Sequence, residues 1–177
     1  MAALTSAPVS PIGPDDHLRG DPGRPTAILY LDLGCRHCAA LWGWAIDLDL
    51  ALCVRHFPLG SRRPRSPFLH AAAEAAGLLG GESAFWSLWD GLLGDQARTD
   101  DPHLWARAEA AGLDPVGFEA TRRDAATIAR VDRDFRGGLR AGVVGTPAAF
   151  LNGVLLSGSI EAGLEGVASS DERRGDL

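Results

Sequence analysis

Apolar and polar positions along the first third of the chain predict a β-α-β unit. The run "TAILYLDL" (26–33) is bounded by proline and glycine, which is typical of a buried strand. Residues 38–48 carry apolar side chains at helical spacing, and the apolar run "ALCVRHF" (51–57) before Pro58 predicts a second strand. We therefore expect two parallel strands joined by a crossover helix.

The pattern from residue 68 to about residue 140 is helical, with clear boundaries. Asp101-Pro102 and Asp114-Pro115 each place an N-cap residue before a proline at the first helical position. Helical order is expected to lapse at the glycine pair 137–138. Three tryptophans fall on apolar faces of these segments and are expected to fill the core: Trp86, Trp89 and Trp105.

The C-terminal part predicts a hairpin and one more helix. "AAFL", "NG" and "VLLSG" (148–158) form two short strands around a two-residue turn, and a helix follows over 159–168. The whole order is then β-α-β, a block of helices, and β-β-α. This predicts an α/β protein with a thioredoxin-like fold, made of residues 26–60 and 141–168, with an all-helical subdomain inserted at 67–140. Residues 169–177 are expected to be a tail.

Residues 1–25 are rich in proline, glycine and aspartate, and predict a flexible N-terminal arm. This segment lacks the basic start and apolar core of a secretory signal. Elsewhere the chain has no apolar run of the roughly 18 residues that a membrane helix needs. The expectation is a cytoplasmic protein with no membrane partner.

Composition and charge narrow the function further. With 177 residues and 46% apolar content, the chain can bury one good core. The net charge of −6 argues against a nucleic-acid partner, because such binding depends on an excess of basic side chains. All the basic residues counted are arginines, so chemistry that needs a lysine Schiff base is excluded.

The candidate chemistry lies in Cys35 and Cys38, at the start of the first predicted helix. A helix N-terminus lowers the pKa of a thiol, so Cys35 is the expected nucleophile, and Cys38, one turn later, can resolve a mixed disulfide. Arg36 and His37 place positive charge beside Cys35. We therefore expect a pKa well below that of a free thiol and a protein more oxidising than a typical thioredoxin.

Zinc is the competing interpretation, because Cys35, Cys38, Cys53 and His56 form a C-x2-C-x14-C-x2-H array. Alternation along a strand points Cys53 and His56 to opposite faces, which disfavours this site. The expectation is no metal and no cofactor, with Cys53 as a buried core residue and His56 as a satisfied histidine at a strand end. Asp32 is left open as either a proton-handling carboxylate or a polar strand end, and the arginines at 62, 63 and 65 are expected to form a solvated loop.

Three motifs in this order, "YLDLGCRHC", "VRHFPL" and "VVGTPAAFLNG", make residues 17–168 resemble the DsbA-like family of thioredoxin-fold disulfide oxidoreductases. The resemblance implies exchange with protein or small thiols through Cys35 and Cys38. It also implies a cis Thr146-Pro147 bond facing the cysteines, with the Thr146 main chain pairing with substrate. Arg36 departs from the family, which usually has proline or glycine there. A non-catalytic module that binds a peptide or partner subunit is the alternative, and the intact cysteine pair argues against it.

Overall fold

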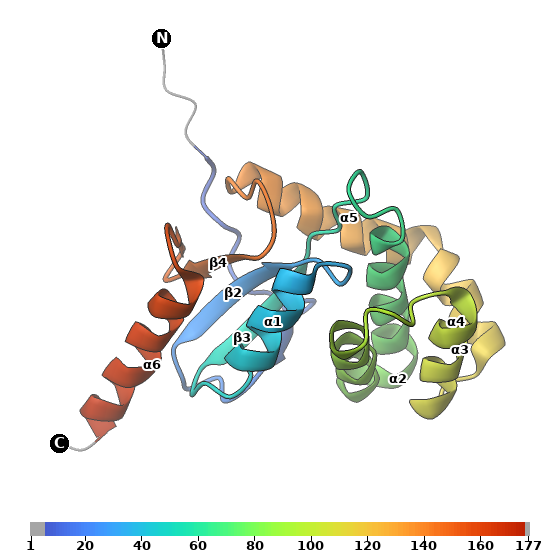
Figure 1. Ribbon diagram of the computed structural model, residues 1–177, viewed down its shortest axis with the longest axis horizontal. Coiled ribbons are helices and arrows are strands. Elements are labelled where there is room, and N and C mark those ends of the chain that lie inside the picture. The colour runs from blue at the N-terminus through green and yellow to red at the C-terminus, as the bar shows by residue number, and fades with distance from the viewer. Residues whose placement is uncertain (1–5, 176–177) are drawn as a thin grey trace, which may run out of the picture.

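A five-stranded mixed sheet forms the centre of the computed structural model, which describes residues 6–175 (Figure 1). The strands are β1 (His17–Arg19), β2 (Thr26–Leu31), β3 (Ala51–His56), β4 (Ala148–Leu151) and β5 (Val154–Leu155). Their spatial order is β1-β3-β2-β4-β5, and only the β2–β3 pair is parallel. These two strands are joined by α1 (Arg36–Ala45), as the apolar pattern predicts.

Side chains of the central strands alternate between two cores. Leu29, Leu31 and Val54 face the larger core, which also takes buried side chains from α1, α2 (Ser66–Gly94) and α6 (Ile160–Gly175). Tyr30 and Cys53 face the smaller core on the other side of the sheet. Strands that are buried on both faces need nearly continuous apolar runs, which is the pattern of "TAILYL" and "ALCV".

Four helices between β3 and β4 form the inserted subdomain: α2, α3 (Asp101–Ala110), α4 (Pro115–Arg123) and α5 (Ala125–Arg140). Helices α2, α3 and α4 lie together on the right in Figure 1, and α5 runs along the top of the view from this group back to the sheet. The thioredoxin-like fold with a helical insertion is therefore confirmed. The first cap lies one residue earlier than predicted, because Asp100 accepts from the N–H of His103, whereas Asp114 caps α4 as expected.

Two tryptophans follow the core prediction and one does not. Trp89 is fully buried, and the half-buried Trp86 stacks on Trp42. Trp105 is 38% exposed, and its indole N–H donates to Glu119. The prediction of a core role for Trp105 is therefore wrong: its helix presents this residue to the edge of the subdomain, where an acceptor on α4 satisfies the indole.

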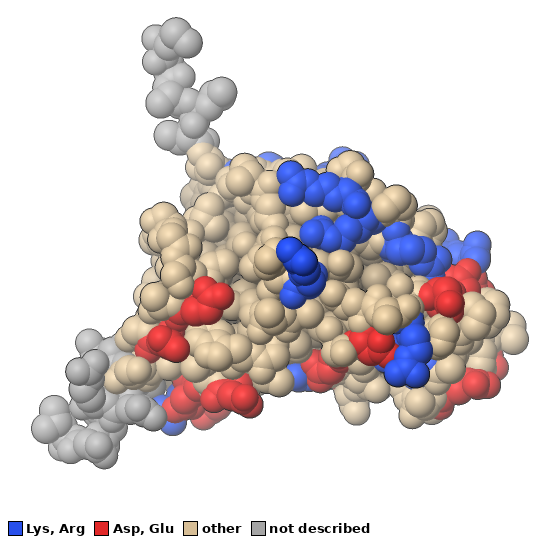
Figure 2. Space-filling model, in the orientation of Figure 1, with Lys and Arg blue, Asp and Glu red and all other residues tan. Residues whose placement is uncertain are grey.

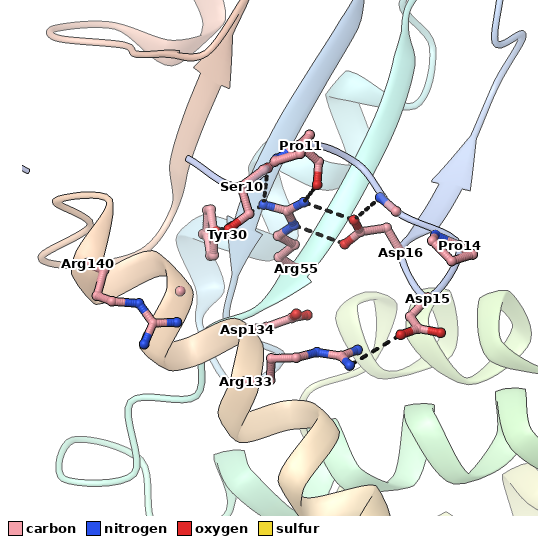
Figure 3. Close-up of a pocket in the computed structure, with 12 residues that line it drawn as sticks. Ser10, Pro11, Pro14, Asp15, Asp16, Tyr30, Arg55, Arg133, Asp134 and Arg140 are labelled. Carbon is pink, nitrogen blue, oxygen red and sulfur yellow. Dashed lines mark hydrogen bonds and ion pairs between the residues drawn. The ribbon is translucent and has the colours of Figure 1, made fainter. Parts of the chain in front are cut away.

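The N-terminal segment does not behave as a flexible arm throughout, because residues 17–19 form β1 and pair with β3. Figure 3 shows how Arg55, near the end of the adjacent strand β3, holds the segment before β1. Its guanidinium donates to both carboxylate oxygens of Asp16, at 2.9 Å each, and to the carbonyls of Ser10 and Pro11. A buried arginine must find such partners, since an unpaired charge is costly in a core.

Helix ends differ from the prediction at two places. The glycine pair 137–138 does not end α5, which runs to Arg140, because Gly138 packs against Tyr30 and Phe57 where a Cβ would approach within 2.9 Å. Helix α6 continues to Gly175, so residues 169–175 extend this helix, and residues 176–177 lie outside the described part. Among the helices of residues 6–175, none combines the length and the apolarity needed to span a bilayer.

Candidate active site

Cys35 and Cys38 lie at the start of α1, where the chain leaves the sheet. Cys35 is the N-cap residue with an extended backbone, and its carbonyl accepts from Ala39 N–H at 3.0 Å. Cys38 follows one turn later, inside the helix. Both side chains are free thiols and both are buried. The fold therefore places the two sulfur-bearing residues on the same helical turn, as their spacing predicts.

The loop before β4 faces this pair. The Thr146-Pro147 peptide bond is cis, and the Cys35 thiol donates to the Thr146 carbonyl across 3.8 Å. Residues 35 and 146 are thus brought together from opposite ends of the chain. Beside them, His37 and Pro147 line a recess that continues to Glu161 on α6. The structure brings Cys35, Cys38, Thr146 and Pro147 into one site.

The environment of Cys35 favours its thiolate. Burial alone would raise the pKa of the thiol, but hydrogen bonds from Cys38 and from the backbone N–H of His37 lower it below its ordinary value, with help from the charge of Arg63. The side chains of Arg36 and His37 are exposed. His37 therefore stabilises the thiolate through its backbone N–H. The positive charge that stabilises the thiolate comes from Arg63, which sequence analysis had placed in a solvated loop.

Cys38 has the opposite character. Burial raises the pKa of its thiol far above the ordinary range, and the neighbouring Cys35 charge adds to this effect. The backbone N–H of Asp32 donates to the Cys38 sulfur at 3.3 Å. The pair is therefore asymmetric: Cys35 is the sulfur that can be a thiolate, and Cys38 is the one that holds its proton.

The carboxylate of Asp32 ties together the loops around the cysteines. It accepts from the backbone N–H groups of Gly34 and Leu59 at 2.9 and 3.1 Å, from Arg63 at 2.9 Å, and from the hydroxyl of Ser66. Burial would raise the pKa of this carboxyl, but the His70 imidazole 3.7 Å away and the hydrogen bonds from Ser66 and Gly34 hold it well below its usual range. These bonds give Asp32 a positioning role. Sequence analysis had left its role open, as either a proton-handling carboxylate or a polar strand end.

The arginine loop is thus partly built into the structure. Arg63 pairs with the buried Asp32, and Arg65 donates to Asp101 and to the Thr99 carbonyl at the start of α3. The expectation of a wholly solvated loop is wrong for these two residues, because each finds an acceptor on a distant segment. Figure 2 shows basic side chains gathered over the upper right of this face, and acidic ones mainly below.

Replacing Arg63 tests the origin of the Cys35 thiolate. In Arg63→Ala the pKa of Cys35 is expected to rise, because a positive charge near the sulfur is lost, whereas Arg36→Ala, which removes an exposed guanidinium, should shift it less. The measurement is a thiolate absorbance titration of the parent and both variants. A larger shift in Arg36→Ala than in Arg63→Ala would contradict the assignment.

The four residues of the possible zinc array do not meet. Cys53 lies in the smaller core with Tyr30, whereas Cys35 and Cys38 lie in the larger core on the other face of the sheet. Burial raises the pKa of the Cys53 thiol to about 12, as befits a core residue. His56 is buried and satisfied, with Glu74 and His70 as partners. Sequence analysis did not find these two partners, although an acidic residue within the alanine run of α2 was a signal.

Comparison with known proteins agrees with this geometry. The profile of the "DSBA-like thioredoxin domain" family matches residues 28–163. Similar solved structures are α-DsbA1 of Wolbachia pipientis (TM-score 0.73, 17% identity, covering 92% of this chain and 96% of that one) and BdbD of Bacillus subtilis (TM-score 0.75, 14% identity, 93% and 99%). DsbA2 of Pseudomonas aeruginosa gives a TM-score of 0.71 at 24% identity, covering 89% and 94%.

Curated relatives are much longer proteins. The chain is 33% identical over 173 residues to the Na(+)/H(+) antiporter NhaA of Herminiimonas arsenicoxydans, covering 93% of this chain and 27% of that protein. It is 33% identical over 156 residues to NhaA 1 of Salinispora arenicola, covering 84% and 24%. The chain thus spans about a quarter of the length of these relatives. The family profile, the fold and the paired cysteines show that the chain belongs to the DSBA-like thioredoxin domain family. At the level of the family, this membership supports an activity as a thiol-disulfide oxidoreductase.

Proposed function

We propose that this protein exchanges disulfides with protein or small-molecule thiols through Cys35 and Cys38. The observation that carries the proposal is the asymmetry of the pair: the pKa of Cys35 is lowered at a helix N-terminus, and that of Cys38 is raised by burial. The Thr146 carbonyl, which accepts from the Cys35 thiol at 3.8 Å, supports it further, because an extended substrate segment can replace that thiol as its partner.

The exchange begins with the cysteine pair as a disulfide when the protein acts as an oxidant. A substrate thiolate attacks the Cys35 sulfur, the bond between Cys35 and Cys38 breaks, and Cys38 leaves as a thiolate that takes up a proton. A second substrate thiolate then attacks the substrate sulfur of the mixed disulfide. The substrate disulfide forms, Cys35 leaves as a thiolate, and two electrons have passed to the protein.

The direction of exchange depends on how strongly the reduced form is stabilised. Reduced Cys35 gains from the N–H groups of the helix start and from Arg63. A stabilised thiolate is a good leaving group and makes the couple more oxidising. We therefore place this protein toward the oxidising end of the couples found in thioredoxin folds.

The similarity to the antiporters points to a second candidate, which concerns the partner of this activity. Two relatives named as Na(+)/H(+) antiporters match this chain over about a quarter of their length. A redox domain that works beside a sodium/proton antiporter is therefore a second candidate, and its partner would be the antiporter. The cytoplasmic location expected from the sequence stays a prediction.

Alkylation and mass mapping test the exchange activity. When the protein is alkylated in denaturant, the peptides of Cys35 and Cys38 should be linked after mild oxidation and alkylated after reduction, while Cys53 should be alkylated in both cases. The oxidised protein should also oxidise a dithiol peptide faster than the uncatalysed reaction. A pair that stays reduced under mild oxidant would refute the proposal and favour a binding module without redox activity.

A further inference from the structure

Three buried side chains from different elements converge at a point that the proposed exchange does not use. His17 on β1, His56 at the end of β3 and Glu74 on α2 are only 8%, 1% and 4% exposed. Both imidazoles direct Nε2 at the same carboxylate oxygen of Glu74, at distances of 3.2 Å for His17 and 2.9 Å for His56. The three atoms lie within 4.8 Å of one another, so one small ion can contact all of them.

The second nitrogen of each imidazole also has a partner. His17 Nδ1 lies 2.6 Å from Glu82, and His56 Nδ1 lies 2.7 Å from Nδ1 of His70. Histidines that bind metals use such outer partners to fix the ring orientation and to strengthen the metal-binding nitrogen. The partners of the two Nδ1 atoms therefore fix the orientation of both rings, and with it the positions of the two Nε2 atoms.

The fixed charges around these three side chains sum to a net negative charge, which favours a bound cation. Glu74, Glu82 and Asp134 supply three carboxylates, and Arg130 supplies one guanidinium, 3.4 Å from Glu74 and 2.6 Å from Asp134. With neutral histidines, the cluster carries two net negative charges. A divalent ion balances them, whereas protonation of His17 alone balances only one.

We propose that His17, His56 and Glu74 bind a divalent transition metal, with zinc as the best match. Two imidazoles and one carboxylate form a ligand set that zinc accepts, with a fourth position for solvent. Because the ligands come from β1, β3 and α2, the ion would fasten the helical insertion to the edge of the sheet. This inference is independent of disulfide exchange.

Metal binding would also reach the active-site loop through His70. The Leu33 N–H donates to His70 Nε2 at 3.0 Å, so His70 carries its proton on Nδ1 and His56 carries its own on Nε2. A metal on His56 Nε2 moves that proton to Nδ1. His70 then holds its proton on Nε2, which lies 3.7 Å from Asp32. Binding of the ion would thus break the hydrogen bond between Leu33 N–H and His70 and form one from His70 to Asp32.

Cobalt titration of the chain with Cys35→Ser and Cys38→Ser tests the site without interference from those thiols. Chelator-treated protein should bind one Co²⁺ per chain, with the visible absorption of a four-coordinate site, and Zn²⁺ should displace it. Adding His17→Gln or Glu74→Gln should abolish binding. Glu82→Gln should weaken it by roughly 10- to 100-fold, because the outer partner of His17 is lost.

Matched controls keep the test decisive. His103→Gln changes a half-exposed residue on α3 and Glu109→Gln an exposed one, and both should leave cobalt affinity unchanged. Circular dichroism establishes which variants are folded. Should His17→Gln fail to fold, Glu82→Gln decides the matter, because the Glu82 side chain is 58% exposed. Absence of cobalt binding by the parent, or equal affinity in Glu82→Gln and the parent, would overturn the proposal.

Discussion

Replacing Cys35 by serine should reduce disulfide exchange to the uncatalysed rate, a loss of several orders of magnitude. The hydroxyl of serine is not ionised at neutral pH and cannot form a mixed disulfide, so neither half of the exchange can proceed. In Cys38→Ser the Cys35 thiolate can still attack a substrate disulfide and release one substrate thiolate, but the resolving thiol is missing. This variant should therefore accumulate a mixed disulfide between Cys35 and substrate, which mass spectrometry detects directly.

Cys53→Ser provides the matched control, because Cys53 lies in the smaller core on the other face of the sheet. This variant should keep the exchange rate of the parent if it stays folded, although burying a hydroxyl there can cost stability. Exchange that survives Cys35→Ser, or a mixed disulfide carried by Cys38 in the parent, would show that the roles of the two sulfurs are assigned wrongly.

Asp32→Asn should lower the free energy of unfolding by roughly 3 kcal/mol, because it removes the charge that Arg63 pairs with and turns an amide NH2 toward other donors. Asp32 is completely buried, so water cannot replace the lost acceptor. Urea unfolding of the reduced protein measures the effect. Asp132→Asn, at a half-exposed position that pairs with Arg136, should change stability by less than about 1 kcal/mol.

The effect of Asp32 should also depend on pH. Its pKa is lower in the folded protein than in the unfolded chain, so its contribution is complete above the unfolded value of about 3.9 and is lost as pH falls toward the folded value. The stability gap between the parent and Asp32→Asn should therefore be widest near neutral pH and should shrink below about pH 4. A gap that is constant down to pH 3 would contradict the assigned role of the charge.

The elements that sequence analysis found share a regular apolar pattern. Strands β2 and β3 are largely apolar runs, and two of the four helices of the insertion, α3 and α4, begin at Asp-Pro signals. Strand β1 has no such signal, because a three-residue strand with one apolar side chain is too short to show alternation. Its formation depends on pairing with β3 and on Arg55, which are interactions with residues more than thirty positions away.

In the candidate site, too, some residues could be predicted from sequence motifs and others only from the folded structure. The cysteine pair and the Thr-Pro loop were visible as motifs, because their residue types and spacing reflect the chemistry itself. The contacts of Asp32 were not visible, since Leu59, Arg63 and Ser66 reach it only after the β3–α2 loop folds back. The one signal was indirect: polar residues such as Arg55, His56 and Glu74 interrupt apolar stretches, and each of them proved to be buried with a partner.

Both edges of the sheet are formed by very short strands, three residues in β1 and two in β5. Long edge strands present a row of unpaired backbone groups, to which the edge of another molecule can add. Here the exposed Val154 and Leu155 offer apolar surface but almost no strand length. The architecture thus limits the addition of strands from other molecules at either edge of the sheet.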